Sequence, residues 1–79
     1  MTATEFLADA LAVLARYQPT AFSIEAHIKA DALGERYRLQ FVHPEYDAIG
    51  FPGWGTPSNK PEYALRDLEA HLSEYYKPV

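Results

Sequence analysis

Hydrophobic residues recur at the spacing of an α-helix along residues 2–17. They form two adjacent rows on one helical face, which are Phe6, Ala10, Val13 and Tyr17, and Leu7, Leu11 and Leu14. Such a face is typical of a helix that packs on a core. Thr2 and Glu5 have the spacing of a capping box, in which each side chain accepts a hydrogen bond from the other residue's backbone N–H. The pattern predicts a helix that starts at Thr2 and stops before Pro19.

From residue 20 onward the apolar residues occupy every second position, which is typical of strands buried on one face. The inward positions are Phe22, Ile24, Ala26, Ile28 and Ala30 in the first strand, and Tyr37, Leu39 and Phe41 in the second. Turn residues 31–34 lie between the two strands, so we expect a hairpin. The outward positions are Glu25, His27, Lys29, Arg36, Arg38 and Gln40. We expect a solvated face there, with a small basic patch made by Lys29, Arg36 and Arg38.

Two registers of this hairpin keep both apolar sets on one face. One pairs Ile28 with Tyr37, and the other pairs Ile28 with Leu39. The second register brings Asp31 opposite Arg36, whereas the first brings a lysine opposite the same arginine. Because opposite charges across a strand pair stabilise it and like charges destabilise it, we favour the second register.

The last part of the chain predicts a second helix from near Pro61 to about Tyr76, with Asn59 or Lys60 as its N-cap. Its expected core stripe is Leu65, Leu68, Leu72 and Tyr75, flanked by Ala64 and His71. Residues 46–51 are expected to add a short third strand, because a hairpin alone is a thin platform for two helices. The sequence therefore predicts an α+β fold in a single domain over residues 1–79, with both helices on one face of the sheet.

Composition narrows the class of function. A chain of 79 residues that is 48% hydrophobic has room for one modest core. It contains no cysteine, which excludes disulfides and cysteine-based metal sites. No apolar run reaches the length of a membrane span, so we expect a cytoplasmic protein, in the cytosol of a host cell. Eleven acidic residues against seven basic ones give a net charge of -4, which disfavours direct nucleic-acid binding and favours a basic protein partner.

No catalytic or metal-binding pattern in the sequence is complete. Ser23, Ser58 and Ser73 have no nucleophile-elbow context, so no hydrolytic triad is indicated. His43, Glu45 and Asp47 share a short span, but no second cluster completes a coordination sphere. Residues 50–60 precede a helix and contain glycines, yet they lack the Gly-Lys-Ser/Thr triplet of a phosphate-binding loop. We therefore expect no catalytic residue, no cofactor and no metal.

Residues 43–61 are the candidate working surface. This stretch has three of the four glycines, four of the six prolines and the only tryptophan. Long connections of this kind in compact domains are usually functional or disordered, and large aromatic residues argue against disorder. The candidate partner-binding residues are Tyr46, Phe51 and Trp54 as aromatic anchors, and Glu45 and Asp47 as an acidic rim. The alternative is that the aromatic rings fold back as the lid of a small core.

Part of this stretch resembles a known family. The residues Gly53-Trp54-Gly55, followed by Ser58, Lys60 and Ala64, are similar to the start of the last helix in double-stranded-RNA-binding domains. The resemblance implies a similar order of helix, strands and helix, with glycines and lysines that hold phosphates. Glu62 and Asp67 depart from it, because that helix start is strongly basic in the family.

The whole chain resembles a second class in its size, acidity, lack of cysteine and aromatic, acidic loop. In these respects it looks like the small inhibitors carried by phages and mobile elements, and most like anti-CRISPR proteins directed at type I surveillance complexes. The resemblance implies a non-enzymatic protein-binding inhibitor, a monomer or weak dimer, that occupies a basic surface and prevents target DNA binding. The alternatives are a small regulatory or adaptor domain that forms a homodimer, and a diverged double-stranded-RNA-binding-like domain.

Overall fold

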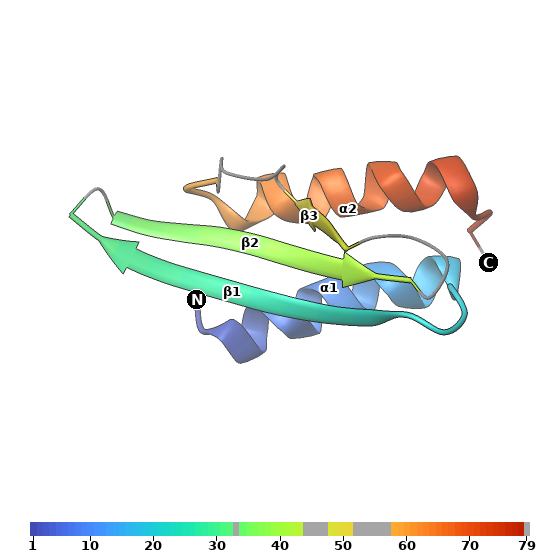
Figure 1. Cartoon of the computed structure of the whole chain (residues 1–79), viewed down its shortest axis with the longest axis horizontal. Helices are drawn as coiled ribbons and strands as arrows, with labels where there is room; N and C mark the ends of the chain where they lie inside the picture. The colour runs from blue at the N-terminus through green and yellow to red at the C-terminus, as the bar shows by residue number, and fades with distance from the viewer. Residues whose placement is uncertain (33, 44–47, 52–57, 79) are drawn as a thin grey trace.

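The computed structural model describes residues 1–32, 34–43, 48–51 and 58–78. The elements follow the order α1 (Ala3–Tyr17), β1 (Ser23–Asp31), β2 (Gly34–Val42), β3 (Ile49–Phe51) and α2 (Pro61–Tyr75). The strands form one antiparallel sheet in the order β1-β2-β3, and both helices lie on one face of it (Figure 1). The predicted α+β fold is confirmed, including the third strand. Figure 1 also shows that α1 and α2 run in the same direction.

Local signals fix the ends of α1 as the sequence predicts. The capping box is present, because Glu5 N–H donates to Thr2 Oγ1 at 3.1 Å and Thr2 N–H donates to Glu5 Oε1 at 3.2 Å. At the other end Gln18 adopts a left-handed conformation with φ of 47°, and its N–H bonds to the carbonyl of Leu14 at 2.8 Å. One expected core residue is not in the core, since Leu11 is 45% exposed.

The register of the hairpin differs from the one that the charges favour. Ile28 pairs with Tyr37, so that Lys29 stands opposite Arg36. The reason is the turn, because Asp31 pairs with Gly34 and only two residues connect the strands, which is the commonest hairpin length. Gly34 has a φ of 109°, which is open to glycine but not to other residues. Asp31 Oδ2 still lies 3.8 Å from Arg36 Nε, so the expected ion pair forms without the expected register.

The core lies between the sheet and the two helices. Its buried side chains are Phe6, Ala10, Val13, Leu14 and Tyr17 from α1, Tyr37, Leu39, Phe41 and Phe51 from the sheet, and Ala64, Leu68 and Leu72 from α2. The inward residues of β1 are only partly buried. Tyr75 was expected in the core stripe but is 61% exposed, because it lies in the last turn of α2 beside the His71 ring, with 4.8 Å between the centroids. The core is thus closed over β2 and thinner over β1.

Candidate functional site

Phe51 is the one candidate partner-binding residue that the structure describes, and it is a core residue. Its side chain is 7% exposed, it pairs with Leu39 on the helix-covered face of the sheet, and its ring centroid lies 5.4 Å from that of His71. The expectation that Phe51 is a surface anchor is therefore corrected, because its place in β3 turns the ring under α2. The other four candidates, Glu45, Tyr46, Asp47 and Trp54, lie outside the described residues.

The structure describes how Phe51 and Ser58, the residues on either side of 52–57, contact the sheet. Phe51 pairs with Leu39 on β2, and Ser58 pairs with Tyr37 through a 2.7 Å hydrogen bond from the Tyr37 N–H to the Ser58 carbonyl. The partners of Phe51 and Ser58 on β2 are Leu39 and Tyr37, which are two residues apart. Phe51 and Ser58 are therefore both fixed to one stretch of the central strand.

Ser58 also prepares the start of α2. Its Oγ accepts a hydrogen bond from the Lys60 N–H and donates one to the Lys60 carbonyl, each at 3.1 Å. Lys60 is the N-cap, as expected, and has no side-chain capping bond of its own. In the first turn the Tyr63 ring, 39% exposed, lies 5.8 Å from Lys60 Nζ and 5.0 Å from Arg66 Cζ. Both distances are within the range of cation–π contacts. An exposed ring between two cations thus lies at the start of α2.

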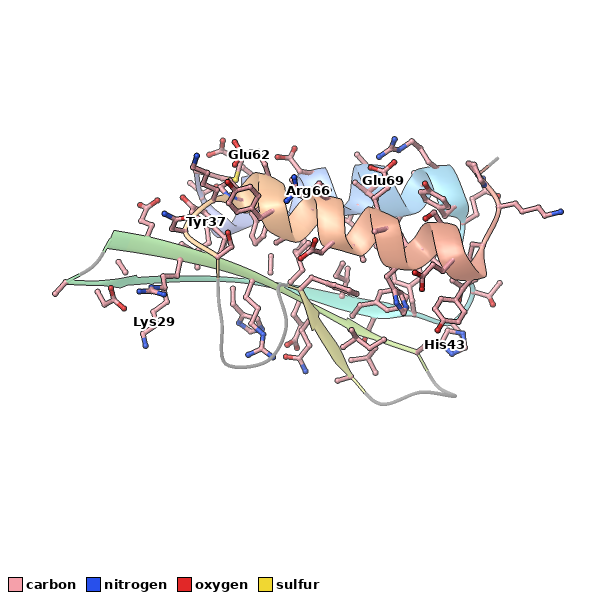
Figure 2. The ribbon with its side chains drawn as sticks, turned by 90° about the horizontal axis from the view of Figure 1, so that it is seen from above. Lys29, Tyr37, His43, Glu62, Arg66 and Glu69 are labelled. Carbon is pink, nitrogen blue, oxygen red and sulfur yellow. The ribbon has the colours of Figure 1, made fainter. Side chains whose placement is uncertain are left out.

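Glu69 on α2 forms polar contacts with two residues of α1. Arg16 on α1 donates from Nη2 to Glu69 Oε2 on α2 at 3.0 Å, and the Tyr17 hydroxyl donates to Glu69 Oε1 at 3.4 Å. These contacts show which sides of α1 and α2 face each other. Figure 2 shows Glu62, Arg66 and Glu69 along α2, on the side of the sheet opposite to Lys29.

The helical period shows which other residues lie on these facing sides, nearer the starts of the two helices. Residues seven apart on a helix lie within about 20° of each other around its axis. Asp9 is seven residues before Arg16, and Glu62 is seven before Glu69. Because the helices run in the same direction (Figure 1), Asp9 and Glu62 lie on the facing sides about two turns earlier. With Glu5 one turn before Asp9, they form a row that we call the acidic seam: Glu5, Asp9, Glu62 and Glu69.

The charge of the protein is unevenly distributed between its two layers. The helices α1 and α2 hold six acidic residues and two arginines, whereas the three strands hold three acidic and three basic residues. The helical layer is therefore negative and the sheet is neutral. Glu5 and Glu62 also lie in first turns, where the helix dipole favours carboxylates. The dipole reduces the cost of gathering these charges.

The outer face of the sheet carries the small basic patch that the sequence predicts. The observed register places Lys29 opposite Arg36 and His27 opposite Arg38. Acidic neighbours offset part of this charge, since Arg36 forms an ion pair with Asp31. Glu25 is on the same face, and its Oε2 lies 3.2 Å from His27 Nε2. A Cβ at Gly50 would lie 2.7 Å from Arg38 Nη2, so the glycine leaves room for the guanidinium. The patch is small and mixed with carboxylates, which makes it a weak surface for phosphate.

Among the residues that the structure describes, Tyr37 and His71 have shifted pKa values. The hydrogen bond from the Tyr37 hydroxyl to Glu35 raises the pKa of Tyr37, and burial and the charges of Glu35 and Glu62 act in the same direction. Burial lowers the pKa of His71, which packs against the rings of Phe41 and Phe51, while Glu74 acts weakly in the opposite direction.

The described residues were also compared with the patterns of metal-binding sites and of membrane-spanning helices. Within residues 1–32, 34–43, 48–51 and 58–78, no group of three or more histidine, cysteine or acidic residues has the arrangement of a metal site. Of the cluster considered from the sequence, only His43 is described. Neither of the two described helices combines the length and hydropathy that crossing a bilayer requires.

No family model matches the chain, and comparison with curated proteins and with solved structures gives no significant match either.

Sequence reasoning missed two features of this site. The acidic seam joins residues of α1 and α2 that are far apart in the chain, and only the direction of the helices brings them together. Tyr63 was also missed, although Lys60, Tyr63 and Arg66 have the i, i+3 spacing that places side chains next to each other on a helix.

Proposed function

We propose that this protein is a non-enzymatic inhibitor that binds a basic protein surface and thereby blocks a nucleic-acid-binding complex. The observation that carries the proposal is the segregation of charge, with a negative helical layer and a neutral sheet. A surface that carries cations for phosphate recognition is matched by a row of carboxylates, because charge-assisted hydrogen bonds replace those to the nucleic acid. The acidic seam supplies such a row on a rigid pair of helices.

The aromatic and acidic residues of 43–61 are the second part of the proposal. Trp54 lies in the sequence between Phe51 and Ser58, both of which pair with β2. Tyrosine and tryptophan are among the residue types that contribute most of the binding energy at protein interfaces. We assign Trp54 and Tyr46 as aromatic anchors, with Glu45 and Asp47 as their acidic rim. Charge steers the encounter, and the aromatic anchors set the lifetime of the complex.

The target that this chemistry fits is the DNA-binding surface of a type I CRISPR surveillance complex in the cytosol of a host cell. Such a surface is basic because it must hold the phosphates of the target DNA. An acidic protein that occupies it competes with the DNA directly and needs no catalytic step. The proposal thus places this chain among anti-CRISPR-like inhibitors by its charge and its loop.

The test is a gel shift of labelled target DNA with a purified type I surveillance complex, titrated with this protein. We expect the DNA complex to disappear as the protein is added, and we expect the inhibition to weaken as salt rises, since screening acts on exposed charges. Trp54→Ala is expected to inhibit less while keeping the circular dichroism spectrum of the wild type. Tyr75→Ala is the control, because it removes an aromatic ring that is 61% exposed and lies outside residues 43–61. Inhibition that is equal in all three proteins and indifferent to salt would contradict the proposal.

A second candidate is favoured by one observation, the order α1, three antiparallel strands, α2. This order agrees with the resemblance to double-stranded-RNA-binding domains, and Lys60 and Arg66 lie near the start of α2. The charge is opposed to it, because α2 has four acidic residues against one arginine. A gel shift with duplex RNA at low salt separates the two candidates, since only an RNA-binding domain retards the duplex without a protein partner.

A further inference from the structure

One edge of the sheet has no described partner. Strand β1 is nine residues long and pairs with β2 on one side. Among the described residues, no strand pairs with its other side. An open edge of this length presents a row of backbone N–H and C=O groups, and it is a template for pairing with another strand. Figure 1 shows β1 as a long outer strand.

The side chains beside this edge are only partly covered. Ile24, Ala26 and Ile28 are partly buried, whereas the inward residues of β2 are buried. On α1, Leu11 is 45% exposed and lies about 140° around the helix from Arg16, which faces α2. Leu11 is therefore on the side of α1 away from α2, which is the side of β1. Apolar surface thus accompanies the open edge on the helical side.

The outward residues of β1 are complementary to themselves when read in the opposite direction. Their order is Ser23, Glu25, His27, Lys29, Asp31. If a second β1 pairs antiparallel with His27 opposite His27, each Glu25 stands opposite a Lys29 of the other copy, and each Ser23 stands opposite an Asp31. The inward residues then pair Ile24 with Ala30 and Ala26 with Ile28. Opposite charges directly across a strand pair stabilise it.

Neighbouring registers lose this match. A shift that brings Ile28 opposite itself places Glu25 opposite Asp31, which sets two acidic residues against each other. A shift that brings Ala26 opposite itself leaves Lys29 opposite Ser23. The register centred on His27 is thus the one in which both charged pairs form, and one-residue shifts are excluded because they turn inward residues outward.

From these observations we propose that the protein forms a twofold symmetric homodimer in which the two β1 strands pair antiparallel, centred on His27, to give a continuous six-stranded sheet. The occupant of the edge is a second copy of this chain. A twofold axis perpendicular to the sheet keeps the helices of both copies on the same face, with Leu11 of each copy toward the axis. The acidic seams stay on the solvent side, so the dimer goes beyond the proposed function and does not compete with it.

The test uses the purified full chain alone, with its mass measured by light scattering and sedimentation over a wide range of concentrations. We expect the mass to double as the concentration rises. Glu25→Lys and Lys29→Glu each replace two opposite-charge pairs by two like-charge pairs, so each variant is expected to dimerise about tenfold more weakly than the wild type. Circular dichroism checks that each variant is folded, and Glu35→Gln is a control outside β1.

Mixing the two variants gives the sharper result. A Glu25→Lys chain has a lysine at both positions and a Lys29→Glu chain has a glutamate at both, so every charged pair between two such chains joins opposite charges again. We expect the mixture to dimerise about as tightly as the wild type, and the double charge swap in one chain to do the same.

Two results would overturn the proposal. A wild type that stays monomeric shows that another kind of chain pairs with the edge, or none. A dimer that is equally strong in both single variants shows that a different surface forms it. These outcomes are independent of whether any CRISPR complex is inhibited.

Discussion

Replacing Phe51 by alanine distinguishes a core role from a binding role at the best-defined candidate residue. The ring is 7% exposed, lies next to His71 and pairs across the sheet with Leu39. Removing a buried phenylalanine ring destabilises a protein by about 3–5 kcal/mol, because burial is lost and a cavity remains. Since β3 has three residues and lies at the rim of the sheet, we expect the lower end, about 3 kcal/mol. In a domain of this size that lowers Tm by about 12 °C or more.

The assay is urea unfolding followed by circular dichroism, with Tyr75→Ala as the control. Tyr75 is 61% exposed, so its replacement is expected to change the free energy of unfolding by less than about 1 kcal/mol. The result that refutes this reasoning is a Phe51→Ala variant that is as stable as the wild type and has lost the proposed binding. Phe51 would then be a surface anchor, and β3 would not hold the ring under α2.

Two further predictions concern stability. Thr2→Ala removes one half of the capping box of α1, so we expect a loss of about 1 kcal/mol in urea unfolding, whereas Thr4→Ala, in the first turn but outside the box, is expected to cost less. His71→Gln tests the lowered pKa of His71: because the unfolded chain binds this proton more tightly than the folded one, stability is expected to fall as pH drops below about 6.5 toward the lower folded pKa. The variant should lose that part of the pH dependence, and equal urea midpoints against pH in both proteins would contradict the assignment.

The elements of this fold were predictable because their signals are local. The capping box and Pro19 mark the ends of α1, and Pro61 marks the start of α2. Alternation of apolar residues marks the hairpin, and the need to support two helices indicates the third strand. The signals for α1, for α2 and for the hairpin each lie within the element or a few residues from it.

The register was mispredicted because a weak interaction was given too much weight. Exposed pairs such as Lys29 and Arg36 contribute at most about 1 kcal/mol across a strand pair. The two-residue connection between Asp31 and Gly34 constrains the backbone itself, and Gly34 adopts the positive φ that the turn requires. Turn geometry therefore decides the register, and long side chains adapt to it, as the diagonal contact between Asp31 and Arg36 shows.

The candidate site was only partly predictable for a different reason. Glycine, proline and tryptophan mark residues 43–61 as unusual, but composition does not tell which ring turns inward, and Phe51 proved to be in the core. The acidic seam depends on the parallel direction of two helices that are separated by the whole sheet in sequence. Charge counts indicated a basic partner, and the fold was needed to place the acidic residues on one layer.

The most direct test of the central claim is the affinity of seam variants for a purified type I surveillance complex, measured by surface binding at low salt. Asp9→Asn combined with Glu62→Gln removes two charges from the acidic seam, and Glu25→Gln combined with Glu35→Gln removes two from the sheet. We predict that the seam variant binds about tenfold more weakly and that the sheet variant binds within about twofold of the wild type. Equal losses in both variants, or no loss in either, would contradict the claim that the helical layer is the surface that meets a basic partner.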